Sequence, residues 1–294
     1  MKHKLSFSER LFDIINIIIM CFLMFITLYP LLFVIFASLS DSTLLMMNNT
    51  SLLLKPLGFQ LSAYQAVLKY PLIRSGYLNT VFIVVAGVGV NLIMTSLGAY
   101  FLSRKNVFWK RPAMIVIIIT MYFGGGLIPS YLNIKNLGML DSLWSVILPS
   151  AISTFNMMIM RTAFESIPRS LEEVAEIDGA GHFIILFRIV LPLSMSTIAV
   201  MVLFYGVHHW NAWFGAMLYI TKKELFPLQL VLRDIVMQNQ TADISNTASD
   251  IDKFAVAETI KYAAIVVATL PILILYPFLQ KYFIKGVMIG AVKG

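Results

Sequence analysis

Acidic side chains gather in one short stretch of this sequence. Five of the chain's fifteen carboxylates fall between residues 165 and 178. They are Glu165, Glu172, Glu173, Glu176 and Asp178. Two interpretations are open: a solvated helix face, or a docking element for a partner whose groove has a basic rim. Anionic lipid headgroups repel such a stretch, so adsorption to a membrane surface is disfavoured.

A second group of polar and aromatic residues runs from His208 to Trp213. Aromatic rings at a membrane interface are ordinary, but histidines and an amide at that depth usually face a cavity or a partner helix. Rings and imidazole donors suit sugars, and a protonated imidazole suits a uronate. A metal site is not expected, because adjacent histidines point to different helix faces. The candidates for a solute path, with packing as the alternative, are His208, His209, Trp210, Asn211, Trp213, Tyr122 and Asn91.

Several kinds of chemistry have no residues to support them in this sequence. There is no G-x-x-x-x-G-K-[ST] motif, so the chain is not expected to bind ATP through a P-loop. No carboxylate lies deep in an apolar stretch; Asp13 and Glu258 sit at the ends of theirs. Ion-driven carriers normally need buried ionisable groups, which argues against a secondary transporter. No nucleophile–base pair or cluster of metal ligands indicates an enzyme.

The composition is that of a membrane protein. Of the 294 residues 59% are hydrophobic and 13% charged, against roughly 25% charged in a soluble domain. Mean hydropathy is +0.83. A bilayer core demands about 20 apolar residues per helix, which predicts an all-α, polytopic bundle with six spans in one domain, residues 1–294. The predicted spans are Ile14–Ala37, Tyr77–Leu102, Pro112–Leu132, Leu143–Met160, Leu193–Ile220 and Ile260–Tyr282.

Loop charges predict the orientation of the chain. More than half of the 22 lysines and arginines lie in the N-terminal segment, the loop Ser103–Arg111, the loop after span four, and the C-terminal tail. Basic loops stay on the cytoplasmic side, so both termini are expected in the cytoplasm. The two long loops Ser38–Gly76 and Thr221–Thr259 are then external. The amphipathic stretch Ala63–Lys69 in the first of them is too polar to span.

Glycines interrupt span three. Gly124, Gly125 and Gly126 are consecutive, and Pro129 follows closely. Small residues allow two helices to approach closely, so tight packing against a neighbour is one interpretation. The other is a local break that bends the helix end around a cavity.

The loop 161–192 is predicted to be a rigid helix–turn–helix. Ser170 and Glu173 have the spacing of a capping box, and Pro168 precedes them. The first helix is expected to end near Asp178, with Gly179 in the left-handed closing position. A second helix should start at His182. Its apolar side chains at helical spacing are Phe183, Leu186, Phe187 and Val190.

The same loop resembles the EAA loop of ABC importer permeases. That family's pattern is E-A-A, three residues, G, then an apolar stretch ending in L-P. The sequence departs from it only at Val174, a small apolar replacement. In the family this loop is the coupling helix that enters a cleft of the ATPase subunit. By that resemblance the coupling residues are Glu172, Glu173, Val174, Ala175, Asp178, Gly179 and Ala180.

Further motifs resemble carbohydrate-uptake permeases of the maltose type, in the branch that imports oligosaccharides from plant or algal polysaccharides such as pectin and alginate. These motifs are Phe123–Pro129, Leu137–Asp141, His209–Phe214, Pro227–Leu230 and Gln280–Gly286. The resemblance implies a type I importer (MetI-like) fold in a bacterial cell membrane. It also implies a second homologous permease, two ATPase subunits that hold ATP and magnesium, and a sugar-binding protein outside the membrane. This chain itself should bind no cofactor and no nucleic acid. An ABC permease for another solute is the main alternative.

Overall fold

The computed structural model describes residues 7–48, 52–105, 107–242, 258–274 and 277. Within these residues the regular elements are helices and no β-strand occurs, which confirms the all-α prediction. The chain divides into two compact units, one of residues 1–70 and 234–269 and one of residues 71–233 and 270–294.

The first unit is built on α1 (Phe7–Ser38), a helix of 32 residues. Pro30 lies inside α1 and does not end it. Most side chains of α1 are exposed, and most of the exposed ones are apolar, as expected of a helix that faces lipid. The short helices α2 (Ser42–Met47) and α3 (Ser62–Lys69) follow. The predicted amphipathic stretch forms α3, whose Ala63 and Val67 are buried.

Asp41 organises the turn after α1. Its Oδ1 accepts hydrogen bonds from the backbone N–H groups of Thr43 and Leu44, which caps α2, and its Oδ2 accepts one from Gln60 at 2.6 Å. The hydrogen bond from the Thr43 side chain contributes most to holding the pKa of Asp41 below its usual value. The loop after α1 is therefore tied down at its start by one carboxylate.

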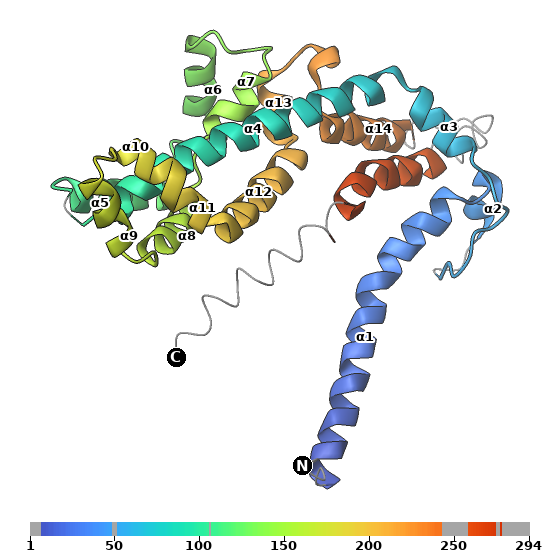
Figure 1. Ribbon diagram of the computed structural model, residues 1–294. Coiled ribbons are helices and arrows are strands. Elements are labelled where there is room, and N and C mark those ends of the chain that lie inside the picture. The colour runs from blue at the N-terminus through green and yellow to red at the C-terminus, as the bar shows by residue number, and fades with distance from the viewer. Residues whose placement is uncertain (1–6, 49–51, 106, 243–257, 275–276, 278–294) are drawn as a thin grey trace. The chain divides into compact units, whose positions relative to one another are not determined.

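The second unit is arranged along α4 (Pro71–Ser103), as Figure 1 shows. Two apolar clusters pack along this helix. One surrounds Ile83, and the other surrounds Leu102 near the carboxyl end. The other helices of this unit, before the loop, are α5 (Lys110–Tyr122), α6 (Leu127–Asn136), α7 (Trp144–Ile147), η1 (Leu148–Ser150) and α8 (Thr154–Glu165). After the loop come α12 (Met195–Trp210), α13 (Phe214–Tyr219), η3 (Lys223–Leu225) and the first residues of α14 (Leu228–Ala242).

The glycine triplet breaks span three. Helices α5 and α6 meet at an angle of 113° across it. Gly126 adopts φ +86°, a left-handed conformation that favours glycine, and each glycine costs a helix about 1 kcal/mol relative to alanine. The packing interpretation finds no support among the described residues, because no other side chain lies within 4 Å of a Cβ built at Gly124. The local-break interpretation is the one that the structure supports.

Spans four and five are also interrupted. Pro149 lacks a backbone N–H, and the chain passes from α7 through the short helix η1 before α8 begins at Thr154. In span five, α12 ends at Trp210, where the Asn211 side chain bonds back to the carbonyl of Val207 at 2.9 Å. Residues 211–213 then separate α12 from α13.

The prediction of six spans is supported only in part. Among the residues that the structure describes, two helices, α1 and α4, are long and apolar enough to cross a membrane, and up to four spans result if each bent helix pair counts as one. In the last predicted span, residues 258–274 are helical and its end lies outside the described residues. The tail motif Gln280–Gly286 and the lysines of both termini also lie outside them.

Candidate functional site

The turn of the predicted helix–turn–helix is closed as the sequence indicates. Helix α9 (Ser170–Ile177) ends at Asp178, and Gly179 has φ +83°. The N–H of Ala180 bonds the carbonyl of Ala175 at 2.9 Å, and the N–H of Gly179 bonds that of Glu176 at 3.0 Å. This pair of bonds is the Schellman motif, which satisfies the last carbonyls of the helix and fixes the direction of the chain.

The predicted capping box does not form. Arg169, not Ser170, occupies the position before α9, and it has helical φ and ψ with no side-chain cap. Pro168 explains the difference, because its carbonyl accepts a hydrogen bond from Leu171 and starts the turn early. Ser170 is thereby inside the helix, where its hydroxyl cannot cap the first amides.

The second loop helix starts at His182 as predicted, but its apolar stripe is split. Leu186 and Val190 are buried, whereas Phe183 and Phe187 are 70% and 53% exposed. The cause is a π-helical segment, η2 (Leu186–Val190), between α10 (His182–Ile185) and α11 (Leu191–Leu193). Pro192 lacks an N–H, and a proline ring collides with the carbonyl four residues earlier in an ordinary helix. A wider turn relieves that collision and rotates the side chains out of a single face.

The coupling candidates divide into buried and exposed residues. Glu172 and Ala175 are buried, and Ala180 is half-buried. Glu173, Val174, Asp178 and Gly179 are exposed. Ile177 is 85% exposed, the largest exposure of an apolar side chain in the loop. The loop thus anchors one face in the protein and presents another that mixes carboxylates with large apolar side chains.

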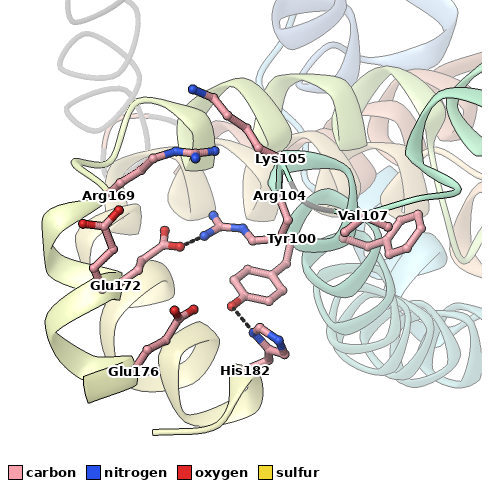
Figure 2. Close-up of a pocket in the computed structure, with 10 residues that line it drawn as sticks. Tyr100, Arg104, Lys105, Val107, Arg169, Glu172, Glu176 and His182 are labelled. Atoms are coloured by element: carbon pink, nitrogen blue, oxygen red, sulfur yellow. Dashed lines mark hydrogen bonds and ion pairs between the residues drawn. The ribbon is translucent and has the colours of Figure 1, made fainter. Parts of the chain in front are cut away.

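The anchored face rests on the carboxyl end of α4. Arg104, directly after α4, forms an ion pair with Glu172 and lies 4.5 Å from the centroid of the Tyr100 ring. The Tyr100 hydroxyl is 3.5 Å from Nδ1 of His182. Figure 2 shows these side chains around a cavity of about 390 Å³, with Arg169 on one side and Glu176 on the other. Burial of the Arg104 guanidinium lowers its pKa, although an arginine stays charged.

Sequence analysis missed this arrangement. Arg104 counted only as a basic loop residue, and Tyr100 had no assigned role. Glu172 lies three residues before Ala175, on the same helix face, and that spacing is the one signal of its burial.

Two of the solute-path candidates are brought together in a buried position. Nε2 of His209 lies 2.7 Å from Oδ1 of Asn91, and the Asn91 amide donates to the carbonyl of Ser150 at 2.5 Å. Asn91 is fully buried and His209 is 1% exposed. The His209 ring fills the space over Gly87, where an added Cβ would lie 2.5 Å from Nε2. These residues link α4, α12 and η1.

The neighbouring His208 is exposed and lines a cavity of about 690 Å³. Mostly apolar side chains surround this space, and Ser150, Ser153 and Asn156 add a few polar groups. A concave apolar site with a small number of polar groups is typical of small-molecule binding. His208 is the one solute-path candidate that lines this cavity.

The other candidates lie elsewhere. Trp210 is buried and forms a T-shaped ring pair with Tyr77. The Arg233 guanidinium lies 4.8 Å from the centroid of the Trp213 ring. Tyr122 is 75% exposed at the break of span three. Asn211 is exposed, and its amide is bonded to its own helix.

Comparisons with known proteins show the family of this chain. Residues 3–289 match the family model described as "Binding-protein-dependent transport system inner membrane component". The chain belongs to this family. It is therefore the permease subunit of an ABC transport system, which works with a partner permease, an ATPase and a binding protein, and it is not itself an enzyme. The prediction of an ABC permease is confirmed, and the alternative of a secondary transporter is not.

Individual relatives cover nearly the whole permease. It is 41% identical over 98% of its length to all of the "Polygalacturonan/rhamnogalacturonan transport system permease protein YtcP" of Bacillus subtilis (strain 168). It is 42% identical over 98% of its length to 96% of "Protein LplC" from the same strain. It also resembles a chain of a "bacterial ABC transporter involved in the import of the acidic polysaccharide alginate", with a TM-score of 0.86, 33% identity, and coverage of 95% of this chain and 99% of that one.

Proposed function

We propose that this permease imports acidic oligosaccharides released from plant or algal polysaccharides. The observation that carries the proposal is the full-length similarity to a polygalacturonan/rhamnogalacturonan permease and to a subunit of an alginate importer. Both names refer to polymers that carry carboxylates. The cavity beside His208 suits such a ligand, because an imidazolium can pair with a uronate while serine hydroxyls bond the sugar.

The loop α9–α10 is the element through which the ATPase subunit would drive transport. Its exposed face combines the carboxylates of Glu173 and Asp178 with the apolar side chains of Val174, Ile177 and Phe183. Such a mixture suits an apolar cleft with a basic rim. In the proposed assembly two homologous permeases each seat one loop in one of two ATPase subunits, which hold ATP and magnesium.

Orientation follows from the distribution of basic residues, with both termini and the loop 161–192 in the cytoplasm of a bacterial cell. A membrane-impermeant thiol reagent tests it in intact cells after Cys21 is replaced by serine. A cysteine at Lys223, which is exposed and expected outside, should be labelled. A cysteine at Lys105, which is exposed and expected inside, should not. The opposite pattern would overturn this orientation.

Uptake by reconstituted vesicles tests the substrate. The complete transporter, with its binding protein outside and ATP inside, should accumulate labelled oligogalacturonate and should ignore a neutral maltodextrin of equal length. Accumulation of the neutral sugar alone would reject the acidic class. Accumulation of neither sugar, with ATP hydrolysis stimulated by an unrelated solute, would favour a permease for another solute.

A further inference from the structure

Arg104 lies where α4 meets the two loop helices, beside a buried apolar cluster that also joins them. Its guanidinium pairs with Glu172 of α9 and stacks on Tyr100, whose hydroxyl lies against His182 of α10. Nε and one terminal nitrogen of Arg104 also donate to Ser103 Oγ at 3.1 and 3.0 Å. These contacts fix the direction of the guanidinium. Figure 2 shows it between the end of α4 and the two loop helices.

The pair is poorly accessible to water. The Arg104 side chain is 18% exposed and that of Glu172 is 11% exposed. At that burial the loss of one partner leaves an uncompensated charge, which costs far more than the loss of a surface pair. The planar guanidinium can pair with a carboxylate and stack on an aromatic ring together, which a lysine ammonium does less well.

Farther along α4, other contacts join this helix to the elements around the cavity. Thr95 bonds the Tyr205 hydroxyl of α12 at 2.7 Å, and that hydroxyl accepts the N–H of Ser153 at 3.2 Å. Asn91 bonds His209 at 2.7 Å. A displacement of α4 along its axis would therefore move α12 and the start of α8, both of which contribute residues to the cavity.

We propose that Arg104 is a positioning residue for energy coupling. It clamps α9 and α10 to α4, so that a movement imposed on the loop is transmitted to α4 and from there to the cavity. Without the clamp the loop would still meet the ATPase, but the movement would be lost between the loop and the spans. This inference rests on the proposed docking of the loop with the ATPase subunit.

Charge reversal and charge exchange test the clamp in the complete reconstituted transporter. Arg104→Glu and Glu172→Arg should each reduce the number of sugars moved per ATP by at least about tenfold, because each places two like charges together at a poorly hydrated site. The double variant Arg104→Glu/Glu172→Arg should recover more than half of the wild-type ratio. Arg104→Lys, which keeps the charge but stacks less well on Tyr100, should fall between the wild type and Arg104→Glu.

Lys110→Glu is the matched control. The Lys110 side chain is also 18% exposed and also pairs with a glutamate, Glu165, at 3.4 Å, but this pair joins α5 to α8 instead of α4 to α9, and Glu165 keeps Arg161 as a second partner. This variant should keep its coupling ratio. A coupling ratio in the reversal variants that stays at the wild-type value would overturn the inference. So would a loss that the double variant fails to repair while its complex assembles in normal amount.

Ile177→Asp separates this inference from the proposal on which it rests. If the loop docks into the ATPase, a charge at this exposed apolar position should release the ATPase subunit during purification. Retention of the ATPase would reject the docking surface itself. Release by Ile177→Asp, together with normal coupling in Arg104→Glu, would reject the clamp alone.

Discussion

Two regions of α4 contact residues that the sequence marks as candidate functional residues. The structure gives these residues different roles in the two regions. At the carboxyl end, the loop buries Glu172 against Arg104 and leaves Glu173, Val174 and Ile177 exposed. In the middle, residues 208–213 bury His209 against Asn91 and place His208 at the cavity beside Ser153. In each region, therefore, one of two adjacent polar residues is buried and fixes a helix, and the other is exposed where it could meet a ligand or a partner. Burial, and not residue type, decides which of the two each does.

The largest effect is expected where a buried polar group loses its partner. Asn91→Leu removes the bond to His209 and the bond to the Ser150 carbonyl, and each buried group left unsatisfied costs roughly 1–3 kcal/mol. The amount of permease recovered from membranes should fall sharply, as measured by quantitative immunoblotting. His208→Ala is the control and should leave that amount unchanged. Normal recovery of Asn91→Leu would show that this contact does not hold α4 to α12.

The next effect concerns the turn of the coupling loop. Gly179→Val forces a β-branched residue into a left-handed conformation, at a cost of about 1–2 kcal/mol. The Schellman turn should open and redirect α10, so that the ATPase is released or hydrolyses ATP without a response to the loaded binding protein. Pull-down of the ATPase and sugar-stimulated hydrolysis measure this.

Gly181→Ala is the matched control, two residues away. Gly181 has φ −73°, and an added Cβ would meet nothing within 4 Å. Alanine should therefore be harmless there. Equal losses of ATPase binding or of sugar-stimulated hydrolysis at both positions would mean that the loop tolerates no side chain, whatever the backbone conformation. The left-handed conformation of Gly179 would then not explain the defect.

These two regions also show how far the sequence leads. The start of the second loop helix at His182 and the left-handed Gly179 could be predicted, because capping and turn chemistry are local. The capping box was wrong because Pro168 starts the turn one residue early, and the apolar stripe was wrong because Pro192 imposes a π-helical turn. In both cases the cause is a proline that lies beside the residues of the predicted motif and not within them.

The partners of α4 could not be read from the sequence. The pairs Arg104–Glu172 and Asn91–His209 join residues 68 and 118 positions apart. No local pattern encodes such contacts, so Arg104 remained a loop charge and His209 a solute-path candidate. The break of span three was one of two interpretations that the glycines left open, because glycine lowers the helix propensity but tertiary packing decides whether the helix continues.

A smaller effect is expected for the exposed histidine. His208→Ala should raise the KM for uptake of oligogalacturonate about tenfold, the loss expected for one charge-assisted hydrogen bond in a partly hydrated site. His209→Ala should instead reduce the amount of permease. His208→Gln, which keeps a hydrogen-bond donor but not the imidazole ring, should fall between wild type and alanine. An unchanged KM for His208→Ala would mean that this side chain does not contact the sugar.

The smallest effects compare two serines at the starts of helices, of which only Ser170 is followed three residues later by a glutamate. Ser153 precedes α8 with extended backbone, and its side chain accepts a hydrogen bond from the N–H of Asn156. Ser170 precedes Glu173 by three residues, as a capping serine would, but it lies inside α9 and makes no cap. Ser153→Ala should therefore cost about 1 kcal/mol of stability, the usual value of a cap. Ser170→Ala should cost no stability or add a few tenths of a kcal/mol, since alanine is the better helix former.

The temperature at which the solubilised complex aggregates measures both variants, with a decrease expected for Ser153→Ala alone. A decrease of equal size for Ser170→Ala would mean that its hydroxyl does cap α9, and that the early turn at Pro168 is not what starts the coupling helix.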